Sequence, residues 1–336
     1  MIDIMNDNLK SVLKVPFIPW IDLKGKSIFI TGATGLIGRA LVKALCLANQ
    51  KWDLHLRIIM LVRDLERASH IFSDIPDRES VHFVVGDVEN EMAIDEPIDF
   101  IVHGAGQTAS REFVNHAVET IHTTVYGTDH ALKLAQDKHV ESLVYLSTME
   151  VYGYPEKGHR VAESEIGQFS PLNLRNSYHI SKITGEMLCF AYAKEYDIPA
   201  KIIRLTQTIG QDVDVYDQRF TAYLRRCAAE KKDIVLKTSG ETERSYIDVA
   251  DAVTAILTVL LKGENGEAYN AADEKTYCSI ADFAKSVAQK NGINVIFNNR
   301  DAAFSGFANT LFMNLKTNAI RGLGWMPISE AFPESD

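Results

Sequence analysis

The sequence lacks the features that mark secreted proteins and membrane proteins. Its four cysteines are scattered, at Cys46, Cys189, Cys227 and Cys278. None belongs to a C-x-x-C pair, which argues against a disulfide framework and against a zinc site. The longest helical apolar run covers residues 252–261, whereas a membrane-spanning helix needs about 20 residues. No basic start followed by an apolar run opens the chain, so we expect no signal peptide. These absences predict a soluble, cytoplasmic protein with no metal site.

Positive charge is also scarce. The 336 residues include 35 lysines and arginines against 45 aspartates and glutamates, which gives a net charge of −10. A surface that binds nucleic acid needs clustered basic residues, so we expect no nucleic-acid partner. A small anionic ligand remains compatible with this charge, because the N-terminus of a helix can hold a phosphate group.

Short apolar runs alternate with helical stretches from residue 26 onward. The runs are almost continuously apolar, as expected for parallel strands that are covered on both faces. We predict strands at 27–31, 56–62, 81–86, 98–104, 142–147 and 200–205. Helical periods lie between them, for example at 113–137 and 177–196. This alternation predicts an α/β fold with a doubly wound parallel sheet of the Rossmann type.

The rhythm changes after about residue 206. Helical segments at 218–230, 249–262 and 279–290 mix with short strands such as 233–237. We therefore predict a smaller mixed α/β lobe that covers the carboxyl edge of the sheet and binds the substrate. The predicted parts are an N-terminal helix and arm (1–24), a dinucleotide-binding domain (25–205) and a substrate-binding lobe (206–336), with a discontinuous boundary between the last two.

A glycine-rich turn follows the first predicted strand. Gly32, Gly35 and Gly38 are spaced G-x-x-G-x-x-G, and the next helix opens at Leu36 and Ile37. The first glycine permits a tight turn, the second lets the backbone approach a pyrophosphate, and the third lets the helix pack closely. The N–H groups at the helix N-terminus then face the anion. In this strand–turn–helix context the spacing predicts a dinucleotide site.

The residues after the second and third strands bear on which dinucleotide binds. An acidic residue at the end of the second strand would favour NAD, but this strand ends in Val62 and Arg63 follows. Arg63 suits the 2′-phosphate of NADP or a stack on adenine, and we predict that Asp64 caps the following helix. Asp87, followed by Val88, is either a partner of the adenine amino group or a turn residue. The sequence predicts NAD, with NADP as the alternative that Arg63 allows.

Tyr178 and Lys182 form a Y-x-x-x-K motif in a helical stretch. Their i, i+4 spacing puts the phenol and the ammonium group on one helix face. A free phenol has a pKa near ~10, and a nearby cation together with a positive nicotinamide ring stabilises the phenolate. Thr148 closes an earlier strand and can share the proton of a sugar hydroxyl. Together with the glycine motif, these residues predict hydride transfer at an alcohol carbon.

The chain resembles the extended short-chain dehydrogenases/reductases, specifically the NAD-dependent epimerases and dehydratases that act on nucleotide sugars. The resemblance covers about residues 25–325. It rests on TGATGLIG (31–38), GDV (86–88), HGAG (103–106), VYGT (125–128), STMEVYG (147–153), YHISK (178–182), RLTQTIG (204–210), ERSYIDVADA (243–252), YNAAD (269–273) and LGW (323–325).

The resemblance implies roles for the residues of these motifs. In that family the matching tyrosine and threonine oxidise a sugar C4 hydroxyl as hydride passes to tightly held NAD. The implied base is Tyr178, with Lys182 as its pKa tuner and ribose ligand and Thr148 as the hydroxyl partner. The resemblance also implies that Ala105 and Gly106 contact the cofactor.

Four further residues are candidate contacts to the substrate: Arg175, Gln207, Arg219 and Arg244. Arg244 matches the family's arginine on the sugar pyrophosphate, or else it forms a salt bridge between the lobes. Arg219 is a second candidate of the same kind. Gln207 and Thr124 stand where the family usually has asparagine, so we expect the contacts of these segments to differ in detail.

The residues after Thr148 bear on the step that follows oxidation. The best-known 4,6-dehydratases resemble Thr-Asp-Glu here, with Asp as the acid at C6 and Glu as the base at C5, but Met149 cannot donate a proton. Decarboxylases of UDP-glucuronate resemble Thr-Ser-Glu or Thr-Cys-Glu and often have R-x-x-Y, as at Arg175 to Tyr178. We expect a decarboxylase or a 4,6-dehydratase in which Glu150 is catalytic. In the structural alternative, Glu150 only caps or pairs with a cation, and Met149 only packs.

Other functions stay open from the sequence. A nucleotide-sugar 4-epimerase, including a uronate epimerase, needs no charge at Glu150, and an NADP-dependent carbonyl reductase would suit Arg63. A non-catalytic dinucleotide sensor would not need an intact Tyr178 and Lys182. We expect a nucleotide-diphosphate sugar as ligand, no membrane association, and a homodimer that forms through a four-helix bundle of the stretches 113–137 and 177–196.

Overall fold

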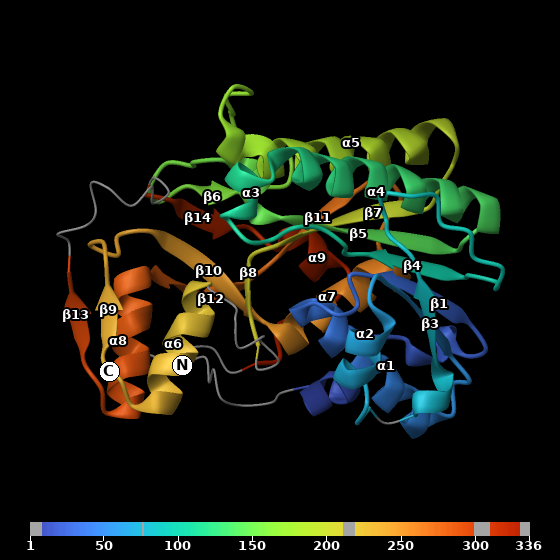
Figure 1. Cartoon of the computed structure of the whole chain (residues 1–336), viewed down its shortest axis with the longest axis horizontal. Coiled ribbons are helices and arrows are strands. Elements are labelled where there is room, and N and C mark those ends of the chain that lie inside the picture. Colours follow the sequence, from blue (N-terminus) through green and yellow to red (C-terminus); the bar gives the residue numbers. More distant parts are fainter. Residues whose placement is uncertain (1–8, 76, 211–218, 299–309, 330–336) are drawn as a thin grey trace.

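A seven-stranded parallel sheet is the largest layer of the protein (Figure 1). The computed structural model describes residues 9–75, 77–210, 219–298 and 310–329. The strands run in the order β11-β7-β5-β4-β1-β2-β3. Their bounds are β1 (Ser27–Thr31), β2 (Arg57–Val62), β3 (Val81–Val85), β4 (Phe100–His103), β5 (Ser142–Thr148), β7 (Ala200–Leu205) and β11 (Ala268–Ala271). The strand order reverses between β1 and β4, and ligands of such sheets bind outside the carboxyl ends of the strands at this point.

Helices cover both faces of this sheet (Figure 1). One face carries α4 (Ala117–Lys138) and α5 (Ser177–Glu195), which pack side by side. The other face carries α1 (Leu36–Trp52), α7 (Val249–Lys262) and the 3₁₀ helix η1 (Leu9–Lys14). Because both faces are covered, apolar side chains are needed in both directions, and Ile58 to Val62 are all buried. The predicted doubly wound parallel sheet is confirmed.

A second region is built mainly from residues after 206. Its larger sheet has the order β12 (Asp273–Ser279), β10 (Glu243–Asp248), β14 (Phe312–Leu315), β6 (Arg160–Val161), and β8 (Gln207–Ile209) pairs with β10. A separate apolar core joins α6 (Phe220–Glu230), α8 (Ile280–Asn291), β9 (Ile234–Leu236) and β13 (Val295–Phe297). The short helices of the chain are η2 (Trp20–Leu23), α2 (Leu65–Ile71), η3 (Arg78–Ser80), α3 (Glu112–Asn115), η4 (Met149–Tyr152), η5 (Leu174–Asn176) and α9 (Asn318–Gly322).

The two regions exchange segments. β11 and α7 come after residue 206 but belong to the layers of the large sheet, while β6 comes earlier and pairs with β14. The chain therefore crosses between the regions more than once, and the predicted division at residue 206 stays a prediction. Residues 1–8 of the predicted N-terminal part lie outside the described residues. The rest of that part, with η1 and η2, packs into the apolar core beside α1, where the rings of Trp20 and Trp52 stack with centroids 5.2 Å apart.

One predicted helix is interrupted. His116 has φ −134° and ψ 52°, and this non-helical residue separates α3 from α4 within the predicted helix over 113–137. The other long predicted helix, over 177–196, is continuous as α5. Across the ranges that the structure describes, no helix is both long enough and apolar enough to cross a membrane.

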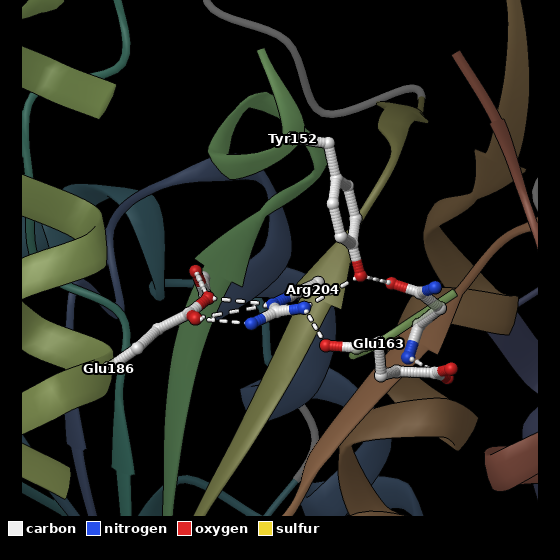
Figure 2. A network of polar contacts seen from close by, with 6 residues as sticks. Tyr152, Glu163, Glu186 and Arg204 are labelled. Carbon is white, nitrogen blue, oxygen red and sulfur yellow. Dashed lines mark hydrogen bonds and ion pairs between the residues drawn. The ribbon is translucent and has the colours of Figure 1, made fainter. Parts of the chain in front are cut away.

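A buried polar network lies where β5 and β7 meet α5 (Figure 2). Arg204 on β7 donates to both carboxylate oxygens of Glu186 on α5, at 2.7 to 3.2 Å. Its Nη1 donates to the Tyr152 hydroxyl and to the Glu163 carbonyl oxygen, each at 2.8 Å. The Tyr152 hydroxyl donates to Asn270 on β11 at 2.6 Å. Burial opposes the positive charge, but Glu186 holds the pKa of Arg204 above its usual value.

Arg204→Leu tests how much this network contributes to folding. The substitution leaves the Glu186 carboxylate buried without its partner, and breaking a buried pair in this way typically costs about 3–5 kcal/mol. We expect the free energy of unfolding to fall by that amount in urea denaturation followed by circular dichroism. Lys26→Met is the control, because it breaks an exposed pair with Glu141 and should cost far less. Equal losses in both variants would show that burial does not set the contribution of the network.

Candidate active site

A cavity of about 500 Å³ runs along the carboxyl ends of the central strands. This volume is typical of sites for cofactors and small molecules. The predicted site residues that line it are Gly32, Gly35, Leu36, Ile37, Gly38, Arg63, Asp87, Val88, Ala105, Gly106, Thr148, Glu150, Tyr178, Lys182, Gln207 and Arg219. Arg175 and Arg244, although both are described, lie outside this lining, and their charges nevertheless reach Glu150.

The glycine loop is folded tightly against its neighbours. Gly32 has a φ of +74°, which favours glycine, and a Cβ there would lie 2.6 Å from the carbonyl oxygen of Gly104. A Cβ on Gly38 would lie 2.3 Å from the carbonyl oxygen of Gly32. These approaches agree with the tight turn and the close helix packing expected from the spacing. The first turn of α1 lines the cavity, where its N–H groups suit a pyrophosphate.

Arg63 and Asp87 follow β2 and β3 at the same edge of the sheet. The Arg63 guanidinium lies 3.9 Å from the Asp87 carboxylate, and an Asp87 oxygen accepts from the backbone N–H of Glu89 at 3.0 Å. Asp64 accepts from the backbone N–H of Arg67 at 2.9 Å and caps α2, as predicted. Asp64 caps this helix and does not line the cavity. The charged residue that lines the cavity directly after β2 is Arg63.

Thr148, Tyr178 and Lys182 come together in the cavity from two elements. Thr148 is the last residue of β5, and its hydroxyl accepts from the backbone N–H of Glu150 at 3.2 Å. Tyr178 is in the first turn of α5, where its ring stacks on Phe113 with centroids 4.3 Å apart. Lys182 is one turn further along, and its Nζ donates to the carbonyl oxygen of Leu146 at 2.7 Å.

Burial and neighbouring charges shift the pKa values of Tyr178 and Lys182. Burial and the negative charge of Glu150 raise the pKa of Tyr178, while a hydrogen bond with Thr148 lowers it in part. Burial lowers the pKa of Lys182 to about 8. Lys182 is not among the groups that shift the Tyr178 pKa. The role of Lys182 in lowering the Tyr178 pKa stays a prediction.

Glu150 lies in η4 and is surrounded by groups that stabilise its charge. Its Oε2 lies 2.9 Å from Nε2 of His179. Burial would raise the pKa of the carboxyl group, but the hydrogen bond and charge of His179, with the charges of Arg244 and Arg175, hold the pKa below its usual value. Glu150 is therefore a carboxylate at neutral pH, which makes it a proton acceptor and not a proton donor.

Met149 is on the cavity wall between Thr148 and Glu150, but its thioether has no proton to donate. Its side chain is buried in an apolar cluster with Val151 and Met313. Its sulfur lies 3.2 Å from the Thr206 hydroxyl oxygen, and this hydroxyl donates its proton to the carbonyl oxygen of Ser245 at 2.6 Å. Met149 therefore packs between β5 and the second region.

Three of the four predicted substrate contacts, Gln207, Arg219 and Arg244, belong to the second region, whereas Arg175 lies in η5. The Gln207 amide oxygen accepts from Nη1 of Arg244 at 3.4 Å, across the paired strands β8 and β10. Arg219 directly precedes α6 and lines the cavity, while residues 211–218 before it lie outside the described residues. The contacts of these side chains to a sugar pyrophosphate stay a prediction.

His179 and Phe113 are site residues that the sequence analysis missed. His179 stands inside the YHISK stretch, but its meeting with Glu150 arises only because η4 packs against α5. Phe113 reaches Tyr178 from α3, far away in the sequence. Neither contact follows a fixed spacing, so no local pattern signals it.

Enzymes that act on nucleotide sugars are among the similar proteins. The chain is 26% identical over 311 residues to dTDP-D-glucose 4,6-dehydratase of Homo sapiens, covering 90% of this chain and 85% of that protein. It is 26% identical over 280 residues to UDP-glucuronic acid decarboxylase 1 of Xenopus tropicalis, covering 83% and 64%. The crystal structure of dTDP-glucose 4,6-dehydratase from Bacillus anthracis in complex with NAD has a TM-score of 0.74 at 22% identity, covering 92% and 93%, and shows the shared fold.

A family model matches most of the chain. The NAD dependent epimerase/dehydratase family matches residues 28–272, a range that contains the glycine loop, Thr148, the Y-x-x-x-K motif and Arg244. The match confirms the predicted resemblance, the prediction of an enzyme and the prediction of NAD as the cofactor. The chain belongs to the NAD-dependent epimerase/dehydratase family.

Proposed function

We propose that the protein oxidises the C4 hydroxyl of a nucleotide-diphosphate sugar with tightly bound NAD and then acts at C5 or C6 of the 4-keto sugar. The observation that carries this proposal is the gathering of Thr148, Glu150, Tyr178 and Lys182 around one cavity with the glycine loop. Similarity to a dTDP-D-glucose 4,6-dehydratase and to a UDP-glucuronic acid decarboxylase supports it. The candidate reactions are 4,6-dehydration and decarboxylation of UDP-glucuronate.

The residues of the cavity fit a dinucleotide. The loop from Gly32 to Gly38 would hold the pyrophosphate, Arg63 and Asp87 the adenosine, and Lys182 the nicotinamide ribose. When bound there, NAD supplies the hydride acceptor, and its positive ring favours the Tyr178 phenolate. Arg63 keeps NADP as the alternative cofactor.

The first step depends on Tyr178 and Thr148. Tyr178 takes the proton of the sugar C4 hydroxyl as hydride leaves C4, and Thr148 orients that hydroxyl. The hydrogen bond between Thr148 and Tyr178 lowers the Tyr178 pKa and so works in the direction that this step requires. Enclosure of Tyr178 by Phe113 fixes the phenol relative to the end of β5.

The second step depends on Glu150. A C4 ketone acidifies the C5 proton, and Glu150 is an ionised carboxylate on the cavity wall that can accept it. A plain 4-epimerase needs no such base, so Glu150 favours dehydration over epimerisation. Met149 offers no acid for a leaving C6 hydroxyl, and this observation keeps decarboxylation as the second candidate, because loss of CO₂ needs no acid there.

We also propose that the protein is a cytoplasmic homodimer. Exposed apolar side chains lie on one face of α4, at Val118 and Ile121, and on α5, at Met187 and Phe190. Their i, i+3 spacing on two packed helices suits a four-helix bundle with a second copy. The four cysteines are all free thiols, as suits a reducing compartment.

A panel of UDP-, dTDP-, GDP- and CDP-sugars tests the reaction class. We expect denatured protein to release NAD, and NMR to show a 4-keto-6-deoxy sugar from UDP- or dTDP-glucose, or a UDP-pentose from UDP-glucuronate. A C4 epimer as the only product would contradict the proposal in favour of an epimerase. Protein that releases no dinucleotide and oxidises NADPH with a simple ketone would instead be a carbonyl reductase.

Glu150→Gln separates the two steps. An amide cannot take the C5 proton, so we expect dehydration to fall by about 10²-fold or more. Oxidation at C4 persists, and NADH therefore accumulates on the enzyme and is measured by its near-ultraviolet absorbance. Glu156→Gln, at an exposed position close in sequence, is the control. Unchanged product formation in Glu150→Gln would contradict a proton-accepting role for this residue.

Phe190→Glu tests the homodimer. Burying a glutamate in an apolar helix interface is unfavourable, so we expect the variant to have half the mass of the wild type in light scattering. Met326→Glu introduces the same charge at an exposed apolar residue away from α4 and α5 and should leave the mass unchanged. A monomeric wild-type protein would refute the proposed assembly.

A further inference from the structure

His179 forms a partly enclosed pair with Glu150. It follows Tyr178 directly in α5, and its side chain is 7% exposed. Its Nε2 lies 2.9 Å from Oε2 of Glu150, whose side chain is 31% exposed. Glu150 lines the cavity, whereas His179 is outside the lining. His179 can therefore influence a bound sugar through Glu150 and not by direct contact.

The imidazole of His179 has little freedom to leave this contact. The ring of Phe169 lies 5.2 Å from it, and the ring of Tyr178 meets it edge-on at 6.1 Å. Its Nδ1 is buried and has no hydrogen-bond partner among the described residues. Within those residues the contact of Nε2 with Glu150 is the polar interaction that fixes the ring.

Groups from three elements other than η4 set the charge of Glu150. His179 and Tyr178 face it from α5, Arg175 from η5 and Arg244 from β10. His179, Arg244 and Arg175 favour the ionised carboxylate. Among these three, His179 is the group at hydrogen-bond distance, so its contribution also fixes the direction of the carboxylate.

We propose that His179 is a positioning residue, which keeps the Glu150 carboxylate ionised and directed into the cavity for removal of the sugar C5 proton. This inference rests on the proposed function. Glu150 takes the proton as the C5–H bond breaks, and the electron pair of that bond moves into the enolate of the C4 ketone. The Glu150–His179 pair then holds the proton, which returns to C5 or exchanges with water.

Two variants of His179 and one matched control test the proposal. His179→Leu removes the hydrogen-bond donor, and His179→Gln keeps an N–H donor without the capacity for positive charge. His159→Leu breaks a similar pair with Glu165, 2.7 Å long, which lies on the surface with exposures of 46% and 40%. Circular dichroism verifies folding, and if His179→Leu does not fold, His179→Gln carries the comparison.

The first measurement needs no sugar. The Glu150 carboxyl carbon is titrated by ¹³C NMR of glutamate-labelled protein, with the signal assigned by its loss in Glu150→Gln. We expect the Glu150 pKa to rise in His179→Leu, to rise less in His179→Gln and to stay unchanged in His159→Leu. An unchanged Glu150 pKa in the His179 variants would overturn the inference.

The second measurement follows the C5 proton. Uptake of solvent deuterium at C5 is measured with UDP-glucose, dTDP-glucose and UDP-glucuronate, beside the formation of enzyme-bound NADH. A raised pKa leaves Glu150 protonated in acid, so uptake in His179→Leu should fall about tenfold for each pH unit below the new pKa and recover in alkaline buffer. NADH formation, which reports the C4 step, should stay close to the wild type.

The outcomes separate this inference from the proposed function. Equal losses of NADH formation and deuterium uptake, at every pH, would mean that His179 only supports the fold, and would overturn the inference. If the wild type forms NADH with none of the sugars, the proposed function fails, and the titration of Glu150 decides the role of His179.

Discussion

The buried ion pair between Arg204 and Glu186 is the interaction on which the geometry of the site depends. Glu186 lies one helical turn beyond Lys182 and two beyond Tyr178, so the pair sets the depth and rotation of α5 on the sheet. The same guanidinium holds Tyr152, the last residue of η4, which contains Glu150 (Figure 2). The Arg204 side chain therefore contacts both elements of the candidate site, α5 with Tyr178 and Lys182 and η4 with Glu150. Glu186 also raises the pKa of Lys182 against the burial that lowers it.

Much of the fold could be predicted because its signals are local. Continuous apolar runs marked six strands of the large sheet, and the glycine spacing marked the turn between β1 and α1. The pairing of β11 with β7 was not predicted, because its four residues carry no signal of their own and their place depends on contacts with a distant strand. The break at His116 was missed for a similar reason, since the helical period continues through it.

Most residues of the cavity could be predicted from the sequence, but Arg175 and Arg244 lie outside its lining, and its electrostatics could not be predicted. The glycine loop, Thr148, Tyr178 and Lys182 line one cavity, and the family that the motifs indicated is confirmed. The i, i+4 spacing of Tyr178 and Lys182 correctly indicated one helix face, yet it could not show that the ammonium group donates to the Leu146 carbonyl oxygen. Burial and the charge of Glu150 dominate the Tyr178 pKa instead, and both depend on tertiary packing.

The same carboxylate connects the two steps of the proposed reaction. While Glu150 is charged, it raises the pKa of Tyr178 and so opposes formation of the phenolate that takes the C4 proton. Once Glu150 has taken the C5 proton, this negative charge is gone, and the phenol becomes a better acid for any later proton return to the C4 oxygen. His179 reaches Glu150 because η4 packs against α5, so the charge that affects both proposed steps depends on this packing.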